Sequence, residues 1–151
     1  MSLGGTKSTA VNSAAANAVS AGVFFAVAAG NEAADASGSS PASEPTVYTV
    51  GATDSSDRVA SFSNYGSIVD IHAPGVSILS TWLNGGTNSI SGTSMATPHV
   101  AGLAAYILGL EGKVTPAALS SRLTTLSTKN KITGLRTGTK NYLAFNGNPS
   151  G

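Results

Sequence analysis

The sequence contains no cysteine, and this absence removes several classes of function at once. Disulfide frameworks, thiolate zinc sites and thiol nucleophiles are all excluded. Charge is also scarce, since 10% of the residues are charged, against about a quarter in a typical domain. Eight Lys and Arg nearly balance seven Asp and Glu, and they are scattered along the chain. This pattern argues against a nucleic-acid partner.

Long apolar runs are missing as well. The longest run, residues 22–29, is far too short for a membrane-spanning helix, which needs about 20 residues. The chain nevertheless has 41% hydrophobic residues among its 151 positions, enough to build a core. Length and composition therefore indicate one compact globular unit and no membrane partner.

Helical and strand-like segments alternate along the chain, as in α/β proteins. Helices are expected at three places, namely residues 8–21, 93–109 and 115–126. Short buried strands are expected at residues 22–28, 46–52 and 67–71. A hairpin is expected from residues 76–81 and 87–90 around Asn84-Gly85-Gly86. Residues 31–44 have the composition of a polar loop, and the last twenty residues that of a surface tail.

The most informative segment is GTSMATPHVAG, residues 92–102. Ser94 lies among small residues at the start of the long apolar helix expected over residues 93–109. Backbone N–H groups and the helix dipole favour negative charge at a helix N-terminus. A nucleophile for acyl transfer needs such a place, because its tetrahedral intermediate carries an oxyanion. Ser94 is therefore the candidate nucleophile.

The chain has two histidines, and neither is a suitable base for Ser94. His99 follows Ser94 by five residues on the same expected helix, which puts the two side chains about 140° apart around its axis. His72 follows a strand-like run and enters the turn at Pro74-Gly75. We interpret both histidines as structural residues.

Asn31 is a second candidate for a role in catalysis, and it ends the segment Val27-Ala28-Ala29-Gly30-Asn31. This segment is a strand that runs into a turn of small residues. The Asn31 amide could donate a hydrogen bond to an oxyanion without titrating. An Asn after a Gly is most often an ordinary turn residue, so both interpretations stand on the residues alone.

The string GTSMATPHVAG resembles the nucleophile motif of the subtilisin-like serine peptidases (subtilases), and its flanks resemble the proteinase K branch. The resemblance implies the C-terminal half of a subtilisin-like three-layer α/β fold with a mostly parallel central sheet. In the family the triad Asp and His precede the serine, and their motifs are absent here. Residues 1–151 are thus expected to be the C-terminal part of one peptidase domain, with Met1 an internal residue.

The resemblance also assigns roles to residues. Asn31 would share the oxyanion with the backbone N–H of Ser94. Ser2, Leu3, Gly4 and Gly5 would form an edge segment that pairs with an extended peptide. That segment and Ala28, Ala29 and Gly30 would form the two walls of the pocket for the residue before the scissile bond. Both walls carry small uncharged side chains, so we expect apolar or aromatic substrates and no carboxylate to favour Lys or Arg. Without the family, the glycines would be a flexible turn.

A structural calcium ion is a further expectation from the resemblance. Its ligands would be the carbonyl groups of Pro45 and Val47 and the carboxylate of Asp70. Calcium prefers several oxygen ligands, so a single carboxylate makes a weak site. The alternative is that Asp70 only accepts hydrogen bonds at the end of a strand.

The expected function is that of a secreted serine endopeptidase acting on peptide or protein substrates. Its companion would be an N-terminal fragment of the same enzyme that carries the catalytic Asp and His. Two alternatives remain at this point. The chain could be a truncated, non-catalytic fragment that at most binds peptide, or a self-standing structural domain with a coincidental motif.

Overall fold

The computed structural model describes residues 1–148, and within them the chain forms a mostly parallel five-stranded sheet. The strand order is β2-β4-β5-β9-β8. In that order the strands are Ala26–Ala28, Tyr48–Thr53, Ile71–Pro74, Tyr142–Leu143 and Thr128–Lys129. The first four run parallel, and β8 is antiparallel to β9. The expected α/β class with a mostly parallel central sheet is confirmed.

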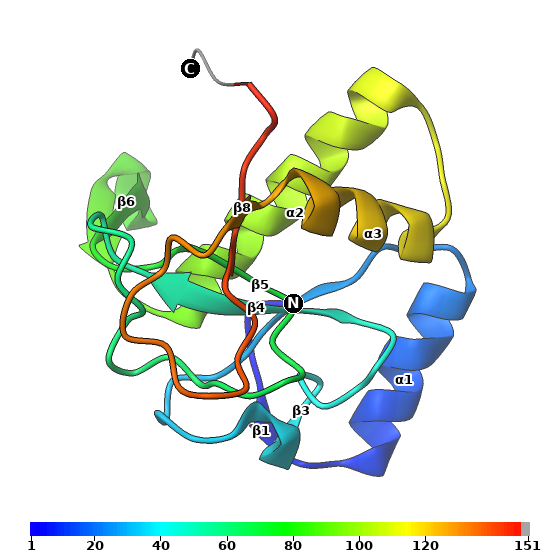
Figure 1. Ribbon diagram of the computed structural model, residues 1–151, viewed down its shortest axis with the longest axis horizontal. Helices are drawn as coiled ribbons and strands as arrows, with labels where there is room; N and C mark the ends of the chain where they lie inside the picture. The colour runs from blue at the N-terminus through cyan, green and yellow to red at the C-terminus, as the bar shows by residue number, and fades with distance from the viewer. Residues whose placement is uncertain (149–151) are drawn as a thin grey trace.

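Helices cover both faces of this sheet, which gives three layers (Figure 1). The helices are α1 (Thr9–Ser20), α2 (Thr93–Glu111) and α3 (Pro116–Leu126). Successive strand residues point to opposite faces. The main core therefore joins one set of strand residues to α2 and α3, and includes Val50, Ile71, Val100, Ile107, Leu119 and Leu123. The alternate Val27 packs with Ala15 of α1 on the other face.

The loop between β5 and the hairpin holds the start of α2 against the sheet. The backbone N–H of Gly92 donates to the carbonyl oxygen of Gly75 at 2.8 Å. A Cβ added at Gly75 would lie 2.6 Å from the Cβ of Ala52 and 2.8 Å from the Gly92 carbonyl oxygen. Only glycine permits this close approach. The Pro-Gly turn after β5 thus fixes where α2, and with it Ser94, begins.

The expected hairpin is confirmed as β6 (Ile78–Thr81) paired antiparallel with β7 (Thr87–Ile90) around η2 (Leu83–Gly85). The loop over residues 31–44 contains a short helix, η1 (Ala36–Gly38), and the strand β3 (Ser39–Ser40). This strand pairs antiparallel with β1 (Gly5–Thr6).

Two strand predictions need correction. The strand expected at residues 67–71 lies instead at Ile71–Pro74, because the preceding residues form a turn in which the Val69 N–H donates to the Gly66 carbonyl. The expected surface tail is wrong, since β9 lies between β5 and β8 and the Ala144 N–H donates to the His72 carbonyl at 2.8 Å. β9 has two residues, which are too few to show the alternating pattern of a strand in the sequence. The end of the expected tail, residues 149–151, lies outside the described residues.

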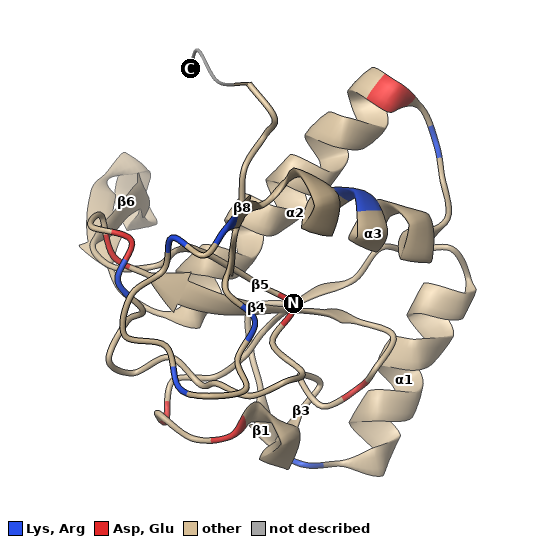
Figure 2. Ribbon diagram, in the orientation of Figure 1, with Lys and Arg blue, Asp and Glu red and all other residues tan. Residues whose placement is uncertain are grey.

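Charged residues are dispersed over this fold. Figure 2 shows Lys and Arg spread over loops and helices, with no basic face among the described residues. In the same part of the chain, no helix combines the length and apolar character needed to cross a membrane.

Candidate active site

Ser94 is the second residue of α2, and its position at the helix N-terminus is as expected from the sequence. Its side chain is partly exposed. The Ser94 hydroxyl donates a hydrogen bond to the carbonyl oxygen of Ser2 at 3.0 Å. The structure therefore brings the candidate nucleophile onto the segment expected to bind peptide. Its catalytic role stays a prediction.

Thr93, directly before Ser94, fixes the orientation of Asn31. The Asn31 Oδ1 atom accepts hydrogen bonds from the Thr93 backbone N–H at 2.8 Å and from its hydroxyl at 2.9 Å. The same hydroxyl accepts a bond from the Gly30 N–H at 3.2 Å. Thr93 is fully buried. With its oxygen held this way, the Asn31 amide group has no partner among the described residues and remains available as a donor beside Gly92. An oxyanion donor requires this arrangement.

Asn64, which the sequence did not single out, holds the loop that carries Asn31. Its Nδ2 donates to the Ala29 carbonyl at 2.9 Å and to Glu32 Oε2 at 2.8 Å. Its Oδ1 accepts from the backbone N–H groups of Glu32 and Ala34 at 3.0 and 2.9 Å. Asn64 is 1% exposed, so all of its hydrogen-bonding groups are satisfied inside the protein.

Gly30 is required by the same arrangement. Its φ of +107° lies in the region that only glycine adopts readily. A Cβ at Gly30 would lie 2.2 Å from Asn64 Nδ2 and 2.6 Å from Glu32 Oε2. The sequence of small residues before Asn31 therefore has a steric cause.

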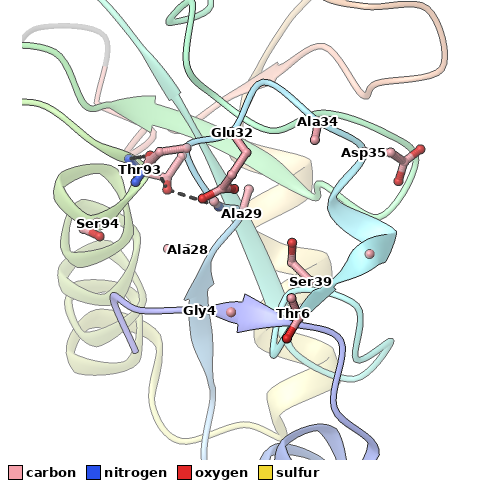
Figure 3. A pocket seen from close by; sticks show the side chains of 14 residues that line it. Gly4, Thr6, Ala28, Ala29, Glu32, Ala34, Asp35, Ser39, Thr93 and Ser94 are labelled. Atoms are coloured by element: carbon pink, nitrogen blue, oxygen red, sulfur yellow. Dashed lines mark hydrogen bonds between the residues drawn. The ribbon is translucent and has the colours of Figure 1, made fainter.

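A cavity of about 390 Å³ adjoins Ser94. Five of the residues expected to form its walls, Gly4, Gly5, Ala28, Ala29 and Gly30, line it together with Ser94. Their role in substrate binding stays a prediction. Figure 3 shows Ser94 on one side of this pocket, and Ser39 and Asp35 on the opposite side. Ser2 and Leu3 do not line the cavity itself, although the Ser2 carbonyl contacts Ser94.

Two carboxylates also line this cavity, and the expectation that it has none is wrong. They belong to Glu32 and Asp35 in the loop after Asn31, which folds back over the pocket. Glu32 accepts the bond from Asn64. Hydrogen bonds from Ser37, one of them from its N–H at 2.8 Å, hold the pKa of Asp35 below its ordinary value. Both residues are exposed and lie at the rim of the pocket, whose wall at Ala28 and Ala29 is apolar.

Neither histidine is placed to activate Ser94. His99 is exposed on α2, with its Nδ1 2.8 Å from the Met95 carbonyl oxygen. His72 is fully buried in β5, where its ring packs so closely on Gly51 that a Cβ there would lie 2.5 Å away. Burial lowers the pKa of His72 to about 4, and the Tyr142 backbone offsets only part of this effect. The described residues give neither ring nitrogen a hydrogen bond of normal geometry.

The three expected calcium ligands lie together. Pro45, Val47 and Asp70 line a second cavity, of about 630 Å³, between β4 and α3. Both carboxylate oxygens of Asp70 already have partners, because Oδ2 accepts from the Thr49 N–H at 2.9 Å and Oδ1 from Lys140 Nζ at 2.8 Å. No group of three or more acidic, His or Cys side chains is gathered within residues 1–148. Calcium binding here stays a prediction.

Comparison with known proteins agrees with this geometry. The model of the subtilase family matches residues 1–142. The chain is 65% identical over 147 residues to the alkaline serine protease ver112 of Corniculantispora psalliotae, with 97% of this chain and 38% of that protein covered. It is 61% identical over 147 residues to the cuticle-degrading protease of Metarhizium anisopliae, with the same coverage of 97% and 38%.

A crystal structure of a cold-adapted subtilisin-like serine proteinase superimposes with a TM-score of 0.93 at 51% identity. The match covers 95% of this chain and 52% of that one. The chain therefore belongs to the subtilase family, and the expected proteinase K branch is confirmed. It spans 38% of the length of the two fungal relatives above.

Proposed function

We propose that this chain is the C-terminal part of the catalytic domain of a subtilisin-like serine endopeptidase, and that it contributes the nucleophile and the oxyanion hole. The observation that carries the proposal is that Ser94, at the α2 N-terminus, lines the same cavity as Asn31, whose oxygen Thr93 holds and whose amide nitrogen lies beside Gly92. A serine in an ordinary helix has no such donor beside it.

The first chemical step would be the attack of Ser94 on the scissile peptide bond. Ser94 Oγ forms a bond to the carbonyl carbon of the scissile peptide, and the carbonyl oxygen takes the negative charge. The Ser94 backbone N–H and the Asn31 amide donate hydrogen bonds to that oxygen. The hydroxyl proton of Ser94 passes to a base, which must come from another part of the protein because neither His72 nor His99 is suitably placed.

Substrate binding would use the segment Ser2–Gly5 and the adjoining cavity. The glycines leave backbone groups accessible to an extended peptide, which could pair with them as an added strand. Apolar walls at Gly4, Ala28 and Ala29 support acceptance of an apolar or aromatic side chain before the scissile bond. The carboxylates at the rim add a site where the end of a long basic side chain could also be accommodated.

The proposed partner is the N-terminal part of the same enzyme, which would supply the catalytic Asp and His. Secretion is proposed as well, since the sequence is poor in charge and the relatives include a cuticle-degrading protease. The alternative is a non-catalytic fragment that only binds peptide. The two differ in whether an N-terminal fragment accompanies the chain when it is isolated.

The test is to prepare residues 1–151 alone and together with the N-terminal part, each with Ser94 and with Ser94→Ala. We expect cleavage of an apolar peptide ester, and labelling of Ser94 by a phosphonofluoridate, only in the combined form with Ser94. The neighbouring Ser91→Ala is the matched control and should keep full activity. Activity in the Ser94→Ala form, or labelling at Ser91, would refute the assignment.

A further inference from the structure

The carboxylate of Asp70 lies at the end of the loop that leads into β5, and the chain itself supplies its partners. Two hydrogen bonds join Asp70 to Thr49. The Asp70 N–H donates to the Thr49 carbonyl at 2.9 Å, and the Thr49 N–H donates to Asp70 Oδ2 at 2.9 Å. This pair fixes the direction of the carboxylate and leaves Oδ1 as the oxygen available for a cation.

That cation is an ammonium group of the same chain. Lys140 Nζ lies 2.8 Å from Asp70 Oδ1, although the two residues are 70 positions apart. The side chain of Asp70 is 23% exposed and that of Lys140 is 40% exposed, so the pair is only partly shielded from water. A partly exposed pair of this kind is weak enough to be exchanged for another cation.

The segment around Lys140 is held in place on both sides. The Thr139 hydroxyl accepts a bond from the Gly66 N–H at 3.0 Å. The Asn141 side chain exchanges two hydrogen bonds with the backbone of Ile132, at 2.9 and 2.8 Å. Because both neighbours of Lys140 are fixed, its backbone is held where its side chain can reach Asp70.

A calcium ion and the Lys140 ammonium cannot use Asp70 Oδ1 together. Calcium binds oxygen ligands at about 2.3–2.6 Å, and a positive charge 2.8 Å from the same oxygen would repel it strongly. Oδ2 already accepts the Thr49 N–H, which uses one of its two lone pairs. We infer that Lys140 is an intramolecular competitor for the cation site at Asp70, so that calcium binds there only when the Lys140 ammonium leaves.

The inference rests on the ion pair and not on the proposed peptidase activity, so its test needs no turnover. The protein that carries this chain is titrated with calcium chloride after treatment with a chelator, and thermal unfolding and calorimetric binding are followed. We expect Lys140→Met to lower the calcium concentration at half-saturation by about two- to fivefold. Lys140→Arg keeps the charge and should behave as the parent protein does.

Two further variants make the outcome specific. Lys131→Met is the matched control, because Lys131 lies on the same segment, is exposed and makes no ion pair with any residue that the structure describes. It should leave the calcium titration unchanged. Asp70→Asn in the Lys140→Met background should remove the gained calcium response, which separates this site from any other in the protein. Equal half-saturation in the parent and Lys140→Met proteins, or a gained response that survives Asp70→Asn, would overturn the inference.

Discussion

Replacing Asn64 by alanine tests whether the oxyanion donor is held by the fold. The substitution removes four hydrogen bonds, two to backbone N–H groups, one to the Ala29 carbonyl and one to Glu32. Ala29 is fully buried, so its carbonyl oxygen would lose its partner without access to bulk water. Glu32 and Ala34 are exposed, and their N–H groups can turn to water.

The magnitude follows from this difference. An orphaned buried group costs about 1–3 kcal/mol, whereas an exchanged hydrogen bond costs about 0.5–1.5 kcal/mol. Because the exposed groups fall at the low end, the free energy of unfolding should drop by about 2–4 kcal/mol. Asn31 lies within the released loop, so kcat should fall by about tenfold or more, up to the 10²–10³ that subtilisin loses when this donor is deleted. The KM should change much less.

The assay combines urea unfolding with steady-state kinetics of the complete enzyme. Asn17→Ala is the control, since Asn17 is exposed on α1 and its side chain makes no hydrogen bond to the described part of the chain. Asn64→Asp is the second variant, because it keeps the two acceptor bonds but places a carboxylate against Glu32, and Glu32→Gln should partly rescue it. A stability loss in Asn64→Ala with unchanged kcat would refute the reasoning.

Two further predictions concern single residues. Asn31→Leu should lower kcat by about 10²–10³ with little change in KM, because the donor acts chiefly in the transition state; an effect confined to KM would mean that Asn31 only shapes the pocket. Burial holds the pKa of His72 at about 4, below its ordinary 6.5. Between these pH values the His72 ring is neutral in the folded protein and protonated in the unfolded chain. The free energy of unfolding should therefore fall as pH falls from about 6.5 to about 4. Melting curves of His72→Leu should show a flatter decline, whereas His99→Gln should match the parent, and an unchanged profile in His72→Leu would contradict the assignment.

The sequence was sufficient where the signal is local. The apolar period of α2 and the small residues before it predicted that Ser94 lies at a helix N-terminus. The turn residues between β6 and β7 predicted the hairpin. In each case neighbouring residues carry the physical cause, so a short window contains it.

The sequence was insufficient where distant segments meet. Asn64 contacts Ala29 from 35 positions away, and Lys140 contacts Asp70 from 70 positions away. Nothing in the residues around Asn64 distinguishes it from a turn amide. Glu32 reaches the pocket only because the loop after Asn31 folds back, which no period encodes. These contacts are products of the tertiary fold.

The described residues orient a hydrogen-bond donor near Ser94, but they place no base beside it. Thr93 binds the oxygen of Asn31, and Asn64 binds the loop on the other side of Gly30, so the proposed oxyanion donor is oriented by the chain itself. Preorganised donors act without a reorganisation cost during the reaction. The hydroxyl proton of Ser94, by contrast, is bound within residues 1–148 by the Ser2 carbonyl, which is not basic enough to accept it. Under the proposed function, an N-terminal partner would need to supply a base but not to orient Asn31, which this chain already does.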